Sequence, residues 1–156
     1  MAVAITVQQY LEDRGVDYEV LTHVHTVSAS RTAQKSHVPG DRVAKAVVLK
    51  ADADYLVAVL PASHHVDLSQ LRGWLGRPVG LATEAEVSEL FPDCALGAVP
   101  PLAGAYGIEV LVDDSLAEQS EVYFEGGDHS SLVHVSADQF RDLTAGARRG
   151  VFSTHD

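Results

Sequence analysis

The chain has 156 residues, a formal net charge of −11 and an ordinary globular composition, 46% hydrophobic and 21% charged. Its length predicts one domain, residues 1–156, and its single cysteine excludes an internal disulfide and fits a reducing compartment. The N-terminal residues lack the basic segment of a signal peptide, and no apolar run reaches the ~20 residues of a membrane span. We therefore expect a cytoplasmic protein with no membrane partner. So acidic a surface also disfavours DNA and nucleic acid in general, unless a local basic patch meets the phosphates.

The first half of the chain predicts two helices, a strand and a β-hairpin. Residues 7–15 read as a helix that Gly15 ends, 17–23 as a strand, and 28–37 as a helix capped by Ser28 or Ser30. Residues 42–61 read as two apolar strands joined by a three-residue turn, Asp52 to Asp54.

The second half predicts three helices, each opened by a capping residue that is followed three places later by Gln or Glu: 67–76, 83–91 and 136–144. Apolar runs predict strands at 107–113, 121–126 and 131–136. Several links between strands are too short for crossover helices. The order therefore favours an α/β fold of the α+β type, a mixed or partly closed, barrel-like sheet surrounded by helices. We expect residues 147–156 to be a frayed tail.

Lys45 is the first candidate for chemistry. Side chains alternate between the two faces of a strand, and both faces of the strand around Lys45 are apolar, so the strand is expected to be central. A lysine among buried neighbours needs an anionic partner or a depressed pKa. The alternative is a structural ion pair, or a side chain that extends to the sheet edge.

Histidines are the second candidates. His23 with His25, and His64 with His65, lie close in sequence, but no third ligand follows at a zinc-binding spacing, so we expect no metal site. His129 follows two glycines at the end of an apolar strand, where a sharp turn can direct a side chain into a cleft. A turn histidine that caps a backbone group is the competing interpretation.

Nucleophile and nucleotide-binding motifs are missing from the sequence. Cys94 has no basic neighbour, and no G-x-S-x-G, Walker A or G-x-G-x-x-G pattern is present. The segment 96–107, LGAVPPLAGAYG, instead combines two prolines and three glycines without a catalytic side chain. This composition suits either a plain loop or a rigid backbone that contacts a ligand closely.

Six motifs follow one another in an order that is specific when all are present: RVAKAVVL (42–49), LPASHHVDLSQL (60–71), LATEAEVSELFPDC (81–94), GAVPP (97–101), YGIEVLVDDSL (106–116) and FEGGDH (124–129). With these motifs the chain resembles the YbaK/EbsC-type aminoacyl-tRNA deacylases, stand-alone relatives of the editing domain of bacterial prolyl-tRNA synthetases. The resemblance covers most of the chain. It implies a mixed α/β fold with a curved, barrel-like sheet, and hydrolysis of the ester between a wrong amino acid and the 3′ adenosine of tRNA.

The resemblance also implies the site. The strand lysine of the family falls on Lys45, its G-x-x-x-P loop begins at Gly97, and its late histidine falls on His129; these three are the expected catalytic groups. His25 stands where many members carry a histidine. The expected substrate contacts are His25, Ala98, Val99, Pro100, Pro101 and Asp128.

An aminoacyl ester is already activated, so backbone groups, Lys45 and a placed water suffice without a covalent nucleophile, cofactor or metal. The expected substrate is tRNA carrying a small amino acid such as Ala, Cys or Ser, presented alone or by a synthetase or elongation factor. A non-catalytic module that binds aminoacyl-tRNA or a synthetase, and a metal hydrolase that uses the histidines, are the alternatives.

Overall fold

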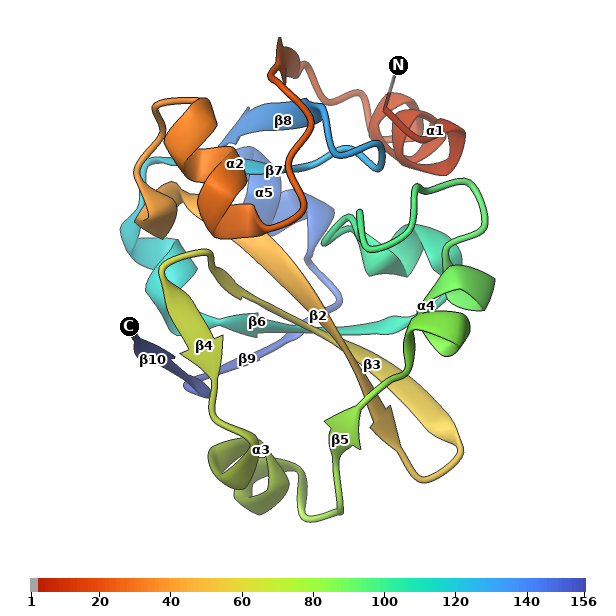
Figure 1. Ribbon diagram of the computed structural model, residues 1–156. Coiled ribbons are helices and arrows are strands. Elements are labelled where there is room, and N and C mark those ends of the chain that lie inside the picture. Colours follow the sequence, from red (N-terminus) through yellow and green to blue (C-terminus); the bar gives the residue numbers. More distant parts are fainter. Residues whose placement is uncertain (1–2) are drawn as a thin grey trace.

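The computed structural model describes residues 3–156, and within them an eight-stranded mixed sheet forms the centre of the molecule (Figure 1). The strand order is β1-β8-β7-β2-β3-β6-β9, with β5 pairing to β2, and β4 and β10 form a separate pair. The strands are β1 (Glu19–Thr22), β2 (Val43–Ala51), β3 (Asp54–Pro61), β4 (His64–Val66), β5 (Gly80–Leu81), β6 (Glu109–Asp113), β7 (Glu121–Glu125), β8 (Ser131–Ser136), β9 (Arg148–Gly150) and β10 (Ser153–His155). The α-helices are α1 (Ile5–Asp13), α2 (Ala29–Lys35), α3 (Leu68–Leu75), α4 (Glu84–Leu90) and α5 (Ala137–Leu143).

The hairpin of β2 and β3 is the spine of the sheet. Its strands pair antiparallel from Ala44 opposite Pro61 to Ala51 opposite Asp54, as the sequence predicts. Parallel pairing then joins β2 to β7 and β3 to β6, whereas β7–β8 and β8–β1 are antiparallel. The mixed sheet is therefore confirmed, and β2, which carries Lys45, is central to it.

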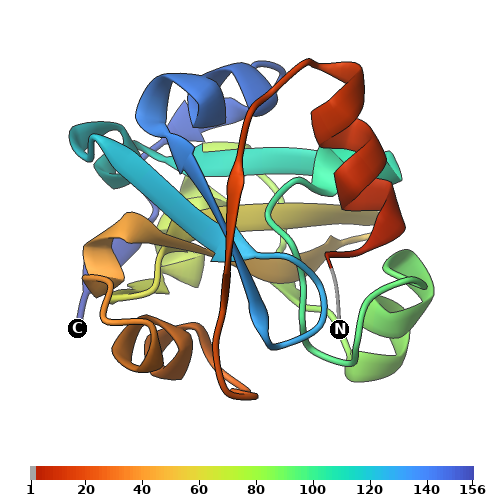
Figure 2. The ribbon, with the colours of Figure 1, turned by 90° about the horizontal axis from the view of Figure 1, so that it is seen from above.

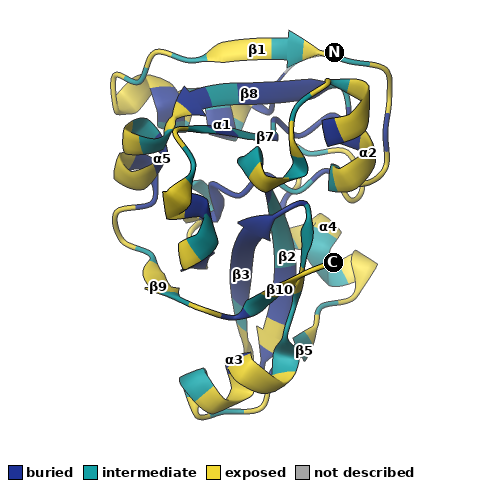
Figure 3. Cartoon of the chain, turned by 90° about the vertical axis from the view of Figure 1, so that its left-hand side faces the viewer, coloured by how far each residue is buried: buried dark blue, intermediate teal, exposed yellow. Residues whose placement is uncertain are grey.

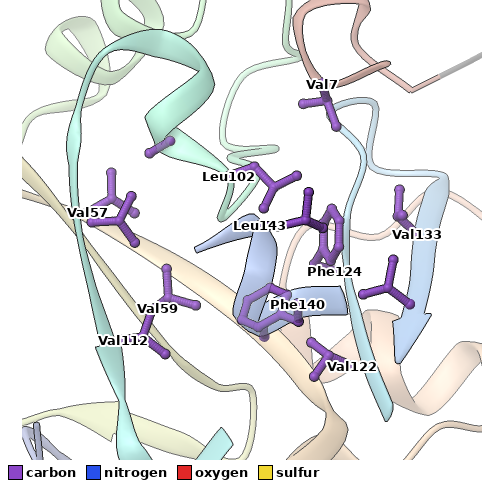
Figure 4. Packing of buried hydrophobic residues seen from close by; sticks show 14 of the residues in the cluster. Val7, Val57, Val59, Leu102, Val112, Val122, Phe124, Val133, Phe140 and Leu143 are labelled. Carbon is purple, nitrogen blue, oxygen red and sulfur yellow. The ribbon is translucent and has the colours of Figure 1, made fainter. Parts of the chain in front are cut away.

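The sheet is strongly curved. Seen from above, β7 and β8 cross over β2, β3 and β6 at a steep angle, with α5 and α1 on the outside (Figure 2). The main hydrophobic cluster fills the space within this curve, where Phe124, Phe140 and Leu143 pack with Leu102 and Val57 (Figure 4). Inward apolar residues on both halves of the sheet thus produce the curved, helix-surrounded α/β fold that the sequence predicts.

The opposite face of the hairpin holds a second cluster. Leu60 and Leu111 from β3 and β6 pack there with Leu71 of α3 and Phe152 of the C-terminal segment, and all four are fully buried. Because both faces of β2 and β3 are covered, these strands are largely buried while the outer sides of the helices are exposed (Figure 3). Apolar residues at most positions of β2 and β3, with Lys45, Lys50 and Asp54 as the exceptions, are typical of such two-sided burial.

Helix starts follow the capping pattern of the sequence. Ser28, rather than Ser30, caps α2 by accepting a hydrogen bond from the amide of Arg31 at 3.1 Å. Thr83 and Ser136 form complete capping boxes at α4 and α5. Each cap satisfies amides that the first turn of a helix leaves unpaired.

The prediction of a frayed tail at 147–156 is wrong. β9 pairs in parallel with β6, and β10 pairs antiparallel with β4. Between them Phe152 is fully buried, its ring stacks on Trp74, and its amide donates to a carboxylate oxygen of Asp113 at 2.9 Å. One buried aromatic residue, Phe152, and one buried carboxylate, that of Asp113, hold the tail in place. A single apolar residue gives no periodic pattern in the sequence, so the sequence does not predict this order.

Candidate active site

A pocket of about 130 Å³ opens between α2, β2 and the loops at residues 97–99 and 125–129. Four residues expected from the sequence line it: Lys45, Gly97, Val99 and His129. The other lining residues are Val27, Ser28, Ala29, Thr32, Val43, Ala44, Ala46 and Glu125. Segments from four distant parts of the chain thus converge on one small cavity.

Lys45 enters the pocket from β2, half-buried. Its ammonium donates to the backbone carbonyl of His64 and forms no salt bridge within residues 3–156. Burial lowers the pKa of Lys45, and the negative charge of Asp156 offsets part of this effect. An ammonium has three N–H donors, so Lys45 keeps donors available for a ligand, and the alternative of a structural ion pair is not what the structure contains.

His129 is held on a tight turn after β7. Gly127 has φ +121°, His129 itself has φ +63°, and the Glu125 carboxylate accepts the amides of Gly127, Asp128 and His129 at 2.8, 3.2 and 3.3 Å. A Cβ on Gly126 would lie 3.0 Å from a methyl group of Val3, so the turn is also closely packed. The strained backbone of His129 therefore has strong local support.

The His129 ring is fixed as firmly as its backbone. Its Nε2 lies 2.6 Å from the carbonyl oxygen of Leu96. Since a carbonyl only accepts, Nε2 carries the proton, and in the neutral ring Nδ1 holds the lone pair. The side chain is nearly buried, at 7% exposure.

Asp128 stabilises the same turn rather than lining the pocket. Its Oδ1 accepts the amides of Ser130 and Ser131 at 2.9 and 2.7 Å, and its Oδ2 accepts the Ser131 hydroxyl at 2.9 Å. These three bonds occupy a buried carboxylate.

The glycine–proline loop meets this turn directly. Gly97 has φ +79°, and a Cβ there would lie 3.8 Å from Cε1 and Nε2 of His129. The amide of Ala95 donates to the carbonyl of Gly127 at 2.8 Å, and that of Ala98 to Ala95 at 2.9 Å. The conformation of Gly97 favours glycine, and the loop is tied to the histidine turn by backbone hydrogen bonds.

Three other expected contacts lie behind the pocket wall. Ala98, Pro100 and Pro101 are buried but do not line the cavity. Pro101 instead lines a separate apolar pocket of about 170 Å³ beside α1 and α5. The fixed φ of both prolines stiffens the loop from behind.

His25 lies beside the pocket, on an exposed segment. Its ring centroid is 5.0 Å from that of His129, with the planes tilted by 56°. The amide of Thr26 donates to the carbonyl of His129 at 3.1 Å, which attaches this segment to the same turn.

Glu125, Ser28 and Thr32 are lining residues that sequence reasoning did not select. Ser28 was expected only as a helix cap, and Glu125 only as part of the motif FEGGDH. Thr32 shares a 2.6 Å hydroxyl contact with Thr26 and donates to the carbonyl of Ser28 at 3.0 Å. A sequence signal for Glu125 existed, since a carboxylate before two glycines can accept the amides of the turn that follows.

Cys94 is not placed to act as a nucleophile. Burial raises the pKa of its thiol to about 11, and the hydrogen bond with Tyr106 opposes this only in part. A thiol that stays protonated at neutral pH is a weak nucleophile.

None of the helices among residues 3–156 has both the length and the apolar composition that a membrane-spanning helix needs.

Two basic residues are exposed on a helix that lines the pocket, despite the acidic chain. Arg31 and Lys35 are exposed on α2, the helix that contributes the pocket residues Ala29 and Thr32, and neither forms a salt bridge among the residues that the structure describes. Lys50 is instead paired with Glu86 at 2.8 Å. Two exposed cationic side chains thus lie on the helix that lines part of the cavity, although neither lines the cavity itself.

A confined pocket that offers an ammonium, an oriented imidazole and a rigid loop is the kind of site that positions a small polar ligand for hydrolysis. The model of one family, the aminoacyl-tRNA editing domain, matches residues 23–143 of the chain. The chain therefore belongs to the aminoacyl-tRNA editing domain family, and its class of activity is that of an aminoacyl-tRNA deacylase.

Individual relatives agree with this assignment. The chain is 30% identical to the multifunctional Ser/Thr-tRNA deacylase ProXp-y of Escherichia coli (strain K12), an alignment that covers 84% of this chain and 82% of the relative. Among solved structures it is similar to the hypothetical protein APE2540, with a TM-score of 0.84, 26% identity and 96% and 99% of the two chains covered. It is also similar to a candidate trans-editing enzyme for prolyl-tRNA synthetase, with a TM-score of 0.83, 26% identity and 96% and 95% coverage.

Proposed function

We propose that this protein removes small amino acids, such as Ala, Cys or Ser, from misacylated tRNA by hydrolysing the ester at the 3′-terminal adenosine. The observation that carries the proposal is the convergence of Lys45, Gly97 and His129 on one pocket of about 130 Å³. A cavity of this size suits a side chain of a few atoms. The similarity to a Ser/Thr-tRNA deacylase supports a small and hydroxyl-tolerant substrate.

The reaction requires no covalent intermediate. A water molecule adds to the ester carbonyl carbon and the bond from that carbon to the ribose oxygen breaks. Of the two protons of the water, one passes to the ribose oxygen and the other to solvent, so the amino acid leaves as a carboxylate. The protein must hold the ester, place the water and stabilise the developing oxyanion. The neighbouring ribose hydroxyl of the substrate is well placed to assist the proton transfer.

Lys45 supplies positive charge in this scheme. Its N–H donors that are not bonded to His64 can contact the ester carbonyl oxygen or the phosphate of the terminal nucleotide. A preorganised charge in a partly dehydrated pocket interacts more strongly than it would in water. The single hydrogen bond to a carbonyl holds the ammonium without neutralising it.

His129 orients the water or the α-amino group. With Nε2 donating to Leu96, the lone pair on Nδ1 is left to accept a hydrogen bond. His25, packed against the His129 ring, limits the ring's motion at the pocket edge.

The loop at 97–101 provides the wall against which the amino acid lies. Gly97 and Val99 line the pocket, while Ala98, Pro100 and Pro101 keep the loop rigid from behind, and Asp128 does the same for the facing turn.

Glu125 gives the pocket a negative charge opposite in sign to the substrate's α-ammonium group. Only one of its oxygens, Oε2, accepts the turn amides. The other oxygen is therefore available for a charge-assisted hydrogen bond, which is worth about 1.5–3 kcal/mol. This attraction would select an aminoacyl ester over an ester without an amine.

The tRNA acceptor end would approach over α2, where Arg31 and Lys35 face solvent. The remaining acidic surface makes tRNA binding by this chain alone weak and salt-sensitive. A synthetase or an elongation factor that presents the tRNA would compensate for this.

Deacylation of a panel of tRNAs mischarged with Ala, Cys, Ser and Thr tests the proposal, with correctly charged tRNAs as controls and with each reaction run both with and without EDTA. The expected result is hydrolysis of the small mischarged amino acids. Activity that disappears with EDTA and returns with zinc would favour the metal hydrolase instead. Binding of aminoacyl-tRNA without hydrolysis, in the presence and absence of a synthetase, would favour the non-catalytic module.

A further inference from the structure

Three potential metal ligands meet on the face where the C-terminal strand docks. Asp41 belongs to a short 3₁₀ helix (Gly40–Arg42), His64 to β4 and His155 to β10. Their ligand atoms all lie within 4.8 Å of one another. The three segments are far apart in sequence, so no spacing motif in the sequence predicts the cluster.

The spacing within the cluster suits a metal ion. Asp41 Oδ1 and His155 Nε2 are 3.5 Å apart. Two ligands that each lie about 2.1 Å from a tetrahedral zinc are separated by roughly 3.4 Å. The imidazoles of His64 and His155 have centroids 5.1 Å apart and meet edge to face, so neither ring blocks the other.

Neighbouring groups orient these side chains as they do in metal sites. His155 Nδ1 bonds the carbonyl of Asp156 at 2.9 Å, and His64 Nδ1 bonds the hydroxyl of Ser153 at 2.9 Å. The hydroxyl of Ser63 donates to Asp41. Each imidazole is thereby held by one nitrogen while Nε2 remains for a metal, an arrangement that fixes the tautomer of ligating histidines.

We propose that Asp41, His64 and His155 bind one divalent transition-metal ion, Zn²⁺ in particular, with water completing the coordination. Two imidazoles and a carboxylate are ligands that zinc accepts. The ion joins the tail to β4 and to the segment before β2, and so acts as a staple for the last strand. The net charge of −11 raises the local concentration of cations.

This site is separate from the pocket. None of its three residues lines the cavity. The link between the two is indirect, because the backbone carbonyl of His64 accepts the hydrogen bond from Lys45. The tail is already placed by the buried Phe152, so the ligands are preorganised before any ion binds.

Calorimetric titration of the purified, chelator-stripped protein with Zn²⁺ tests the proposal, and Co²⁺ absorption, which is stronger in four-coordinate than in six-coordinate sites, reports the geometry. Wild type should bind one equivalent. His155→Gln and Asp41→Asn should weaken binding by ~100-fold or more, because even outer contacts of a metal site are worth about 10–100-fold. By the same reasoning Ser153→Ala should weaken it by about tenfold.

His65→Gln is the matched control. His65 is the next histidine of β4; unlike the half-buried His64 it is exposed, it pairs with Asp156 at 2.8 Å, and it lies outside the cluster. It should keep wild-type affinity, and circular dichroism should show that all variants remain folded. Zn²⁺ should also slow amide hydrogen exchange in residues 153–155 of wild type and not of His155→Gln.

Failure of wild type to bind Zn²⁺, or equal binding by His155→Gln, Asp41→Asn and wild type, would overturn the proposal. So would loss of binding in His65→Gln alone. The readouts do not involve tRNA, so this proposal and the deacylase proposal can fail independently.

Discussion

The ring of His129 donates from Nε2 to the carbonyl oxygen of Leu96 across 2.6 Å, and this bond connects the turn after β7 to the loop that carries Gly97. The two segments that line the candidate site are therefore positioned relative to each other by a side chain that also faces the pocket. A substitution of His129 must be chosen so that it separates the two roles.

His129→Gln makes that separation. The side-chain nitrogen of glutamine is as many bonds from Cα as the histidine Nε2, so it can still donate to Leu96, but glutamine lacks the imidazole Nδ1. We expect kcat for deacylation to fall by ~100-fold or more, in the range of a lost acid–base group, while the positive φ of this position costs the fold no more than about 1–2 kcal/mol. Single-turnover kinetics beside thermal melts check this. A variant with unchanged kcat would assign His129 a purely structural role.

Lys45→Met keeps most of the side-chain volume and removes the charge. We expect deacylation to fall by about 10²–10³-fold, as for the loss of one preorganised electrostatic group. The fold should persist, because the ammonium forms no salt bridge among residues 3–156 and burial already lowers its pKa.

Lys50→Met is the control for Lys45→Met. Lys50 lies on the same strand but is exposed and paired with Glu86, away from the pocket. It should retain wild-type rates. Similar rate losses in both variants would indicate that net charge, rather than the position of Lys45, governs activity.

Two substitutions of Gly97 distinguish whether this position requires glycine because of backbone strain or because a side chain would fill the pocket. Its φ of +79° disfavours alanine, whereas the nearest atoms to a Cβ, in the His129 ring, are at an ordinary contact distance of 3.8 Å. Left-handed backbone costs about 1–2 kcal/mol for most residues and less for asparagine. If strain dominates, Gly97→Ala should be less stable than Gly97→Asn and slow all substrates alike.

If pocket size dominates instead, Gly97→Asn should be the slower variant, and its defect should grow from tRNA charged with Ala to tRNA charged with Thr. Measuring kcat/KM on these tRNAs together with urea unfolding decides between the two. A substrate side chain that is one methylene too large for the pocket lowers kcat/KM by ~10–200-fold.

Local and long-range features of the molecule differ in how far the sequence predicts them. The hairpin around Lys45 and the caps Ser28, Thr83 and Ser136 depend on nearby residues alone, and they are confirmed. The resemblance that the motifs establish is confirmed by the family match. The residue roles inside the site remain proposals.

What the sequence misses depends on segments that meet only after folding. The tail is ordered because Phe152 packs against Trp74, a residue far from it in the sequence. The cluster of His64 and His155 requires two strands that are far apart in the chain. No local periodicity encodes these encounters.

Glu86 gives the stability of the protein an acid-dependent component. Its hydrogen bond with Lys50, and others with Thr83 and Tyr55, hold the pKa of the Glu86 carboxyl at about 2, below the ordinary 4.5. A depressed pKa stabilises the folded state above the unfolded value, and this contribution is lost as the pH falls from about 4.5 toward 2.

Glu86→Gln should therefore be less stable than wild type near neutral pH, and the difference should shrink as the pH falls through that window. Glutamine still accepts from the amide of Thr83, so the helix cap is retained. Urea unfolding of both proteins at several pH values measures the difference. A gap that stays constant down to low pH would mean that the charge of Glu86 contributes nothing.

Phe152 tests whether the C-terminal segment is part of the folded core. Its side chain is fully buried in the second cluster with Leu60, Leu71 and Leu111, so Phe152→Ala removes a large apolar group and leaves a cavity. Such substitutions cost about 3–5 kcal/mol. Val151→Ala is the control, because Val151 is 58% exposed and should change stability by no more than about 0.5 kcal/mol.

Urea unfolding of both variants gives the free energies, and hydrogen exchange of residues 153–155 reports whether β10 detaches first. We expect Phe152→Ala to lose protection in β10 and, because His64 is the partner of His155 across the β4–β10 pair and accepts the Lys45 bond, to lower deacylation as well. A loss of less than about 1 kcal/mol with unchanged exchange would show that the tail is only loosely attached, whatever the buried position of its aromatic ring.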